Sequence, residues 1–536
     1  MCAAAVLLIG SAVTQGVRAT SVKRHAAVDI ADNKARVTQV WTTVRDRQGR
    51  QVRGQGVLVG IVDSGIDYRN PDFRNAGGKT RIKFMWDQTA TGKPPAGFSY
   101  GNVCTPAQIN NESCTERDRE GHGTHVAGIA AGNGRSSSPA RFLGVANMAD
   151  LGIVKVRGTT ETDVADACRY LTEKARQLHE PIVINLSLGS EHGPHDGSGP
   201  EAQALNKLTG PGRIIVAAAG NESLRAGHAS GVVREGETAH ARFTTHDVTD
   251  GTLHLYYPVG TTLSIRLVDE ATGQQFIPSS DGRITTHASD DGTYKVAMQI
   301  HRLNAAWETV TAVIVATRRV VNDPFDLSLE GQRVNQSARF NVWSGGSHIR
   351  FRDPDRFITL STPADARNVV AVANYTTRVS YADAAGQTIT FCQLLTCPVQ
   401  SQKVGSLDPS SSWGPTVDGR QKPDIAAPGG LITSSRSEDV PTCRSAAQPA
   451  CILPQLLVNG GRNAIALGTS MASPMVAGTV ALMLQVRPQL TAQKARQILR
   501  DTARHDSFTG KAAWTPQWGA GKLDALAAVR RAKSLG

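Results

Sequence analysis

Ser470 has the neighbours that a nucleophilic serine needs. It lies in the run Gly468-Thr-Ser-Met-Ala-Ser-Pro474, which directly precedes the apolar segment 475–484. That segment is long enough for a buried helix, and Pro474 is tolerated in the first turn because its missing N–H costs little there. The Ser470 hydroxyl would then lie at a helix N-terminus, where backbone N–H groups favour a developing negative charge. A Ser- and Ala-rich helix start in a packed core is the alternative, because a lone serine still needs a base.

Two other segments supply a base and a residue to orient it. The apolar run 57–62, typical of a buried strand, ends at Asp63, and His122 lies among glycines in the run Gly121-His-Gly-Thr-His-Val-Ala-Gly128. An Asp that orients a His, and a His that takes the proton of a serine, form the triad of acyl-transfer enzymes. We therefore predict Asp63, His122 and Ser470 as the catalytic residues. His125, on the same helix as His122, is interpreted as structural.

These three motifs, in the order Asp, His, Ser, resemble those of the subtilisin-like serine peptidases, the subtilase family. The order differs from that of chymotrypsin-like and α/β-hydrolase enzymes, and Gly-Thr-Ser-Met-Ala is not a Gly-x-Ser-x-Gly elbow. The resemblance covers about residues 40–224 and 360–530. It implies a serine endopeptidase that hydrolyses extended polypeptides through an acyl-enzyme. Ser470 would attack the carbonyl, His122 would move the proton, and Asp63 would hold the imidazole tautomer.

The resemblance also assigns an oxyanion donor. Asn221 follows the strand-like run Ala217-Ala-Ala-Gly220, and its carboxamide resembles the family's oxyanion asparagine. A turn asparagine that tolerates a positive φ is the alternative. Glu222 comes next, and it could favour a basic substrate residue at the mouth of the pocket.

Two strand exits are expected to bind the substrate. In the family, such segments wall the pocket for the residue before the cut, and the peptide adds as a strand. Without the rest of the pattern, an ordinary strand-to-loop exit would be the favoured interpretation. The substrate-binding residues that we predict are Ser187, Leu188, Gly189, Ala218, Ala219 and Gly220.

The elements that position these residues alternate between strand-like and helix-like segments over residues 35–224. This alternation is the signature of a parallel sheet with helices on its faces, which binds ligands at the carboxyl ends of its strands. The expected fold class is α/β, a subtilisin-like parallel sheet flanked by helices. We expect strands at 57–62, 151–156, 182–186 and 214–218, and helices at 122–131, about 163–178, after Ser470 and after Thr491.

Between Asn221 and Pro363 the pattern changes to an alternation of period two, with Gly and Asp turns between the segments. This predicts an inserted all-β sandwich or jelly-roll domain. It resembles the insert of some bacterial subtilases, including those of the Clostridium spore-germination (Csp) type. A lid, substrate wall or binding module competes with a rigid brace as its role. The expected strands are 253–257, 263–267, 294–300, 310–315, 325–329, 338–342 and 349–351.

The predicted domain organisation has four parts. Residues 1–34 are a leader or propeptide remnant, 35–224 and 361–536 form the catalytic domain, and 225–360 form the insert. Family members commonly carry a propeptide, but none is evident before about residue 35. No run reaches the ~20 apolar residues of a membrane span.

Three close cysteine pairs lie in loop-like stretches: Cys104/Cys114, Cys392/Cys397 and Cys443/Cys451. Such pairs predict disulfides and an oxidising compartment, hence a secreted or cell-envelope protein. The resemblance to bacterial subtilases implies that it is bacterial. Zinc is the alternative, but Cys-x-x-Cys spacing and a His cluster are missing. Cys168 is expected to be a buried thiol.

The net charge of +12 is spread along the chain without a dense basic block, so no nucleic-acid partner is expected. A polypeptide substrate is the expected partner, and the triad needs no cofactor. Calcium as a structural ion is a weaker hypothesis. Asp72 matches a family ligand position, but the loop 133–141 that would complete the site carries two arginines, and a tight site needs ~6–8 oxygens.

Two other functions compete with the peptidase. The first is a catalytically quiet binding or scaffold protein on a subtilase fold, which acts through the inserted β domain. The second is an esterase or transferase that uses the same acyl-enzyme. Intact Asp63, His122, Asn221 and Ser470 favour the peptidase.

Overall fold

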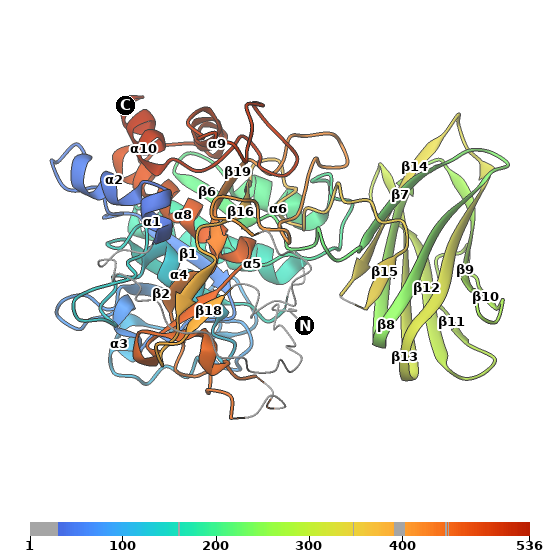
Figure 1. Ribbon diagram of the computed structural model, residues 1–536, viewed down its shortest axis with the longest axis horizontal. Coiled ribbons are helices and arrows are strands. Elements are labelled where there is room, and N and C mark those ends of the chain that lie inside the picture. The colour runs from blue at the N-terminus through green and yellow to red at the C-terminus, as the bar shows by residue number, and fades with distance from the viewer. Residues whose placement is uncertain are drawn as a thin grey trace.

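The computed structural model describes residues 30–158, 161–346, 348–390, 402–444, 448 and 450–535. It contains an α/β part and an all-β part that projects to one side (Figure 1). The α/β part is built on an eight-stranded sheet in the order β19-β16-β6-β5-β1-β4-β2-β3, in which only the β2–β3 pair is antiparallel. Its strands are β1 Leu58–Asp63, β2 Ile82–Asp87, β3 Asn102–Cys104, β4 Asp150–Lys155, β5 Ile182–Leu186, β6 Arg213–Ala218, β16 Val370–Thr376 and β19 Ile425–Gly430.

Helices cover both faces of this sheet. Alternate residues of β1 show the two layers: Val59 and Ile61 pack into a cluster with α4 and α8, whereas Leu58 and Val62 pack with α5 and α6. The predicted parallel sheet with flanking helices is therefore confirmed. The helices are α1 Ile30–Lys34, α2 Val37–Thr43, α3 Pro106–Asn110, α4 His122–Ala131, α5 Glu161–Leu178, α6 Pro200–Leu208, α8 Thr469–Val486, α9 Ala492–Asp501 and α10 Ala525–Ser534, with short 3-10 turns η1 Pro71–Phe73, η2 Pro454–Leu456 and η3 Asn459–Gly461.

Helix α8 forms the centre of the α/β part. It contacts β5, β6, β16 and β19 on one side and α4 and α10 on others, and every one of its residues except Ser470 is buried. Among the described residues it is the one helix long and apolar enough to cross a bilayer, but 94% of that window is buried inside the protein. A core helix therefore holds Ser470 at its accessible end.

In the α/β part, the expected starts and ends of the elements agree with the structure to within two residues. In the insert, the strand expected at 253–257 is part of the longer strand Thr238–Pro258, and the strands expected at 310–315 and 325–329 are parts of the single strand Trp307–Arg333. Thr491 caps α9 as expected, since its side chain accepts from Lys494 N. Helix α1 lies inside the predicted leader 1–34, yet Ala31 is buried in the same apolar cluster as α8. Residues from Ile30 onward therefore belong to the packed α/β part, and the rest of the predicted leader lies outside the described residues.

The inserted part is an antiparallel sandwich. Its two long strands, β8 Thr238–Pro258 and β13 Trp307–Arg333, pair along most of their length and pass from one layer to the other through irregularities between Val315 and Pro324. One layer adds β9 and β15 to these strands, and the other adds β12 and β14. A single apolar cluster lies between the layers, which confirms the predicted β insert. Its remaining strands are β7 His228–Val233, β9 Thr262–Asp269, β10 Gln275–Phe276, β11 Thr285–Ala288, β12 Tyr294–Arg302, β14 Ala338–Gly345 and β15 Ile349–Phe351.

Two small sheets and two disulfides complete the α/β part. The sheets pair β17 Ser380–Ala382 with β18 Thr388–Thr390, and β22 Asn463–Ala466 with both β20 Ile432–Ser435 and β21 Leu457–Val458. Cys104–Cys114 and Cys443–Cys451 are bonded as predicted, and Cys168 is a buried free thiol. The predicted pair Cys392/Cys397 lies outside the described residues.

Candidate active site

Asp63 and His122 meet where β1 ends and α4 begins. His122 Nδ1 lies 2.7 Å from Asp63 Oδ1, and that oxygen also accepts from Ser64 N at 2.8 Å. The Asp63 side chain is 4% exposed and that of His122 26%, so the carboxylate is shielded while the ring reaches the surface. The contact with Asp63 therefore engages Nδ1, and Nε2 is the ring nitrogen that lies outside this contact.

A buried carboxylate that the sequence did not indicate ties these two elements together. Asp118 accepts from Ser64 Oγ at 2.8 Å, from Gly121 N at 2.8 Å and from Thr124 N at 2.9 Å. Ser64 Oγ in turn accepts from Gly123 N at 2.9 Å. The strand end at Asp63 and the helix start at His122 are thus joined by one polar network.

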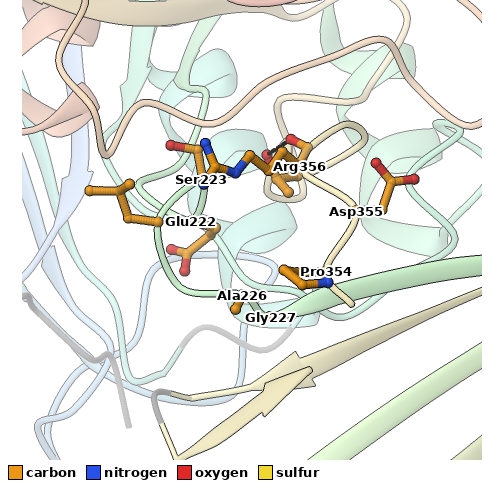
Figure 2. A pocket seen from close by; sticks show the side chains of 9 residues that line it. Glu222, Ser223, Ala226, Gly227, Pro354, Asp355 and Arg356 are labelled. Carbon is orange, nitrogen blue, oxygen red and sulfur yellow. Dashed lines mark hydrogen bonds between the residues drawn. The ribbon is translucent and has the colours of Figure 1, made fainter. Parts of the chain in front are cut away.

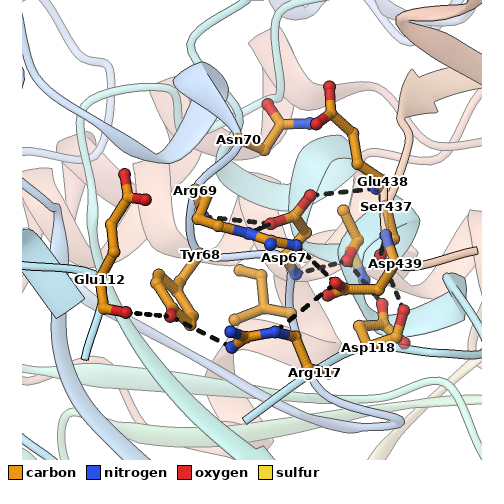
Figure 3. A network of polar contacts seen from close by, with 12 residues as sticks. Asp67, Tyr68, Arg69, Asn70, Glu112, Arg117, Asp118, Ser437, Glu438 and Asp439 are labelled. Atoms are coloured by element: carbon orange, nitrogen blue, oxygen red, sulfur yellow. Dashed lines mark hydrogen bonds and ion pairs between the residues drawn. The ribbon is translucent and has the colours of Figure 1, made fainter. Parts of the chain in front are cut away.

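The loop residues 437–439 also contact this network (Figure 3). Ser437 Oγ donates to Asp118 O at 2.7 Å, and Glu438 N donates to Asp67 Oδ2 at 3.0 Å. Arg69 bridges Asp67 and Asp439 through its guanidinium. The polar network around His122 is therefore held in place by residues more than 300 positions away along the chain. Local sequence spacing cannot reveal such contacts.

The surroundings of the two histidines of α4 shift their pKa values in opposite directions. Burial disfavours the His122 imidazolium, but the Asp63 carboxylate, with Asp118 and Glu120 nearby, outweighs burial and raises the His122 pKa above its ordinary value of 6.5. His125 is buried, and burial lowers its pKa to about 4. Its Nε2 lies 3.2 Å from Ala464 O. His125 therefore has the surroundings of a neutral, structural histidine.

Ser470 lies in the first turn of α8 and contacts one of the predicted walls. Its Oγ donates to Ser187 O at 3.2 Å, and Ser187 Oγ donates to Ser470 O at 2.7 Å. Ser470 and His122, both among the described residues, share no hydrogen bond. Catalytic hydrogen bonds of this kind often tighten only when substrate binds.

Asn221 lies beside the turn that leads into α8. Its Oδ1 accepts from Thr469 N at 2.9 Å and from Thr469 Oγ1 at 3.1 Å, and Thr469 Oγ1 accepts from Gly220 N at 3.2 Å. A backbone N–H can only donate, so these bonds fix the amide oxygen toward Thr469 and leave the NH₂ group as the free donor. Sequence reasoning missed Thr469, although it lies within the Gly468–Pro474 run.

The two predicted walls both contact Ser361. A Cβ at Gly220 would lie 2.3 Å from Ser361 Oγ, and a Cβ at Gly189 would lie 2.8 Å from Ser361 Cβ. Ser361 N also donates to Ala219 O at 2.9 Å. The glycines are therefore required by close packing, and Ser361 contacts both predicted walls.

The other predicted wall residues lie at or directly after the ends of β5 and β6. Ala218 is the last residue of β6 and is buried, as is Ser187, while Leu188 is half-buried and packs against the cluster under α5 and α6. All six predicted wall residues thus lie at the ends of β5 and β6. This is the carboxyl edge of the sheet.

Glu222 has an ion-pair partner. Its carboxylate pairs with Arg225, and both side chains are largely buried, at 16% and 31% exposure. They lie where the chain enters the sandwich, beside a small cavity lined by the entering residues 222–227 and the leaving residues 354–359 (Figure 2). The expectation that Glu222 offers a free negative charge to basic substrate residues is therefore not supported.

Asp72, the calcium candidate, is surrounded by hydrogen-bond donors. Its Oδ1 accepts from Ser136 N at 2.8 Å, and its Oδ2 accepts from Ser136 Oγ at 3.0 Å and Ser435 Oγ at 2.6 Å. Both oxygens of this fully buried carboxylate are thus already satisfied. The described part of the chain contains no group of three or more His, Cys, Asp or Glu placed to hold a metal.

The carbonyl oxygens near Asp72 are held by a guanidinium. Arg81 donates to Ala131 O and Ala149 O, each at 2.7 Å, and to Asp72 O at 3.2 Å. Converging carbonyls are what calcium requires, and here a buried cation of the chain itself takes them. The residues present therefore do not fit a calcium site.

The Subtilase family model matches residues 54–297 and 279–521. The PIII-type proteinase of Lactococcus lactis subsp. cremoris (strain SK11) is 24% identical over 506 residues, which cover 85% of this chain and 23% of that protein. A subtilisin of Bacillus sp. (strain TA39) is 35% identical over 172 residues, 31% of this chain and 34% of that one. The chain thus spans about a quarter to a third of these relatives. The solved Clostridium perfringens CspB protease is 23% identical, with a TM-score of 0.70 over 94% of this chain and 97% of that chain.

Proposed function

Because the chain belongs to the subtilase family, we propose that it is a serine endopeptidase that hydrolyses extended polypeptides through Asp63, His122 and Ser470. The observation that carries this proposal is the 2.7 Å contact between Asp63 and His122, at the same sheet edge as the accessible hydroxyl of Ser470. Asn221, with its amide oxygen fixed by Thr469, is the proposed oxyanion donor.

In the proposed mechanism, the Ser470 hydroxyl leaves the Ser187 carbonyl and turns toward His122 Nε2. His122 takes the proton while Ser470 Oγ attacks the peptide carbonyl, and Asp63 stabilises the imidazolium. The Asn221 NH₂ group and the Ser470 N–H donate to the tetrahedral oxyanion. His122 then protonates the leaving amine, and water hydrolyses the acyl-enzyme by the same steps in reverse.

We further propose that the substrate adds as a strand beside the exits of β5 and β6. Main-chain bonds give affinity there and side-chain pockets give selectivity. Ser187, Leu188 and Gly189 form one proposed wall, and Ala218, Ala219 and Gly220 form the other. An extracellular or cell-envelope site of action is supported by the disulfides Cys104–Cys114 and Cys443–Cys451.

The proposal is tested by labelling the folded chain with a fluorophosphonate probe, with Ser470→Ala as the control. We expect labelling that disappears in the variant, followed by cleavage of a peptide substrate. An unlabelled chain that unfolds cooperatively would contradict the proposal and favour a scaffold role for the sandwich. Labelling with ester but no peptide hydrolysis would favour an esterase.

A further inference from the structure

The sandwich turns one polar and aromatic face toward the α/β part. In β8, Leu253, Leu255 and Tyr257 point into the sandwich core, so His254 and Tyr256 point to the opposite face. Strand β14 alternates in the same way. Its core residues are Phe340 and Val342, and its outward residues are Asn341 and Trp343, which pair in register with Tyr256 and His254.

This face holds one segment of the α/β part, residues 190–198, which we name the wall loop. Gly193 N donates to Tyr256 OH at 2.8 Å, and Trp307 Nε1 donates to Asp196 Oδ2 at 2.7 Å. These two bonds connect the wall loop to β8 and β13. A third bond, from Asn304 Nδ2 to Ser198 Oγ at 3.0 Å, lies at the far end of the loop.

Stacked aromatic rings add to the contact between the sandwich and the wall loop. Trp343 lies between His195 of the wall loop, at 4.0 Å between ring centroids and 19° between planes, and His228 at the start of β7, at 4.7 Å and 13°. The His195 ring also lies 3.3 Å from Glu191 O and 2.6 Å from Leu360 O. The ring stack thus reaches the residue that precedes Ser361.

The wall loop continues directly from the proposed pocket wall 187–189. Ser190 and Thr362 exchange backbone hydrogen bonds of 3.0 and 2.9 Å, and Ser361 Oγ donates to Glu191 Oε1 at 3.1 Å. A displacement of the wall loop would therefore move Ser361, which contacts both proposed walls.

We infer that this face of the sandwich positions the substrate pocket, with Tyr256 and Trp307 as positioning residues for the wall loop. Selectivity for the residue before the cut then depends on a domain that does not touch the reacting atoms. The inference rests on the proposed peptidase function, because that function makes the two walls a substrate-binding site. It distinguishes the sandwich from a brace that supports only the stability of the fold.

The test compares Tyr256→Phe and Trp307→Phe with Tyr294→Phe. Tyr294 is the matched control, because its hydroxyl bonds to Asp323 inside the sandwich, away from the wall loop. The substrates are succinyl-Ala-Ala-Pro-X-p-nitroanilides with X as glycine, leucine, phenylalanine or arginine. We expect both test variants to change the ratio of kcat/KM between the preferred X and glycine by about tenfold, mainly through KM, as loss of a buried hydrogen bond allows.

The rate of fluorophosphonate labelling distinguishes a failure of the proposed function from a failure of the positioning role. We expect it to stay within about twofold of the native rate in all three variants, because the probe does not need the pocket. Absence of labelling in the native chain would remove the proposed function itself. Normal labelling with an unchanged ratio of kcat/KM between the preferred X and glycine would overturn the positioning role alone. An equal loss of kcat/KM for every X would overturn it as well. Trp307 is half-buried, so Trp307→Phe decides the matter if Tyr256→Phe does not fold.

Discussion

The carboxylate of Asp63 holds His122 by Nδ1, at 2.7 Å, so that the other ring nitrogen is the one left for a proton from serine. This makes Asp63 an orienting residue, and Asp63→Asn would present an amide that can favour the wrong imidazole tautomer. We expect kcat to fall by about 10⁴ with little change in KM. Steady-state hydrolysis of a peptide p-nitroanilide measures it, and a fall of less than tenfold would contradict this role.

The same contact extends this first prediction to the dependence of activity on pH. Since Asp63 raises the His122 pKa above 6.5, and the general base must be neutral, activity should rise with pH through a pKa above 6.5. In Asp63→Asn the stabilising charge is lost, so the remaining activity should rise at a lower pH. Profiles of kcat/KM against pH for both proteins measure the shift, and coincident acid limbs would contradict it.

Asn221 gives the second prediction. Because Thr469 fixes its amide oxygen, Asn221→Ala should remove one oxyanion donor and lower kcat by ~10²–10³ with KM nearly unchanged. Asn75→Ala, at an exposed turn, is the control and should leave kcat unaltered. An equal rise in KM would instead indicate that Asn221 binds the ground state.

The sequence allowed prediction of those features that local patterns encode. Period-two alternation predicted the sandwich strands, and the residues around Asp63, His122, Asn221 and Ser470 predicted the catalytic elements, because each motif lies within one strand end or helix start. The structure then places these residues at one sheet edge.

The supporting contacts could not be predicted because they join distant segments. Ser361 lies 172 and 141 positions from the two glycines that it packs against, and the sequence gives no sign of either contact. The contacts that bear on the calcium hypothesis also join distant segments. Asp72 resembles a family ligand position, but the groups that satisfy its carboxylate are Ser136, in a loop, and Ser435, the last residue of β20.

Arg225 gives the third prediction. It neutralises Glu222 near the proposed pocket, so Arg225→Gln should free a negative charge and raise kcat/KM for substrates with lysine or arginine before the cut. We expect a gain of roughly three- to tenfold relative to leucine, as a partly exposed charge allows. Arg234→Gln, from an exposed pair with Glu237, is the matched control. An equal gain in both variants would indicate an effect of net charge alone.

The surroundings of Asp72 give the fourth prediction, on metal removal. Since donors satisfy the carboxylate and Arg81 holds the nearby carbonyls, EDTA should not lower the Tm and added calcium should not raise it. Arg81→Met leaves three carbonyls without this donor and should reduce the free energy of unfolding by ~2 kcal/mol or more. A Tm that falls on chelation would show a metal that stabilises the fold elsewhere.

Two histidines between the two parts, the buried His228 and the half-buried His254, give the last prediction. Burial lowers the pKa of His228 to about 4, and burial together with nearby His192 and His195 lowers that of His254 to about 3. Both are neutral in the folded protein, whereas the unfolded chain binds their protons near pH 6.5. The unfolded state therefore gains more protons as pH falls from about 6.5 toward 4, and stability falls with it.

His254→Leu tests this dependence because it removes one such group. The loss of unfolding free energy between pH 7 and pH 4.5 should shrink by roughly 2 kcal/mol relative to the native chain. Other titrating groups are common to both proteins and cancel in the comparison. His505→Leu, at an exposed position, should follow the native curve. Denaturant unfolding at the two pH values measures the difference, and parallel losses in all three proteins would show that carboxylates, rather than this junction, set the acid sensitivity.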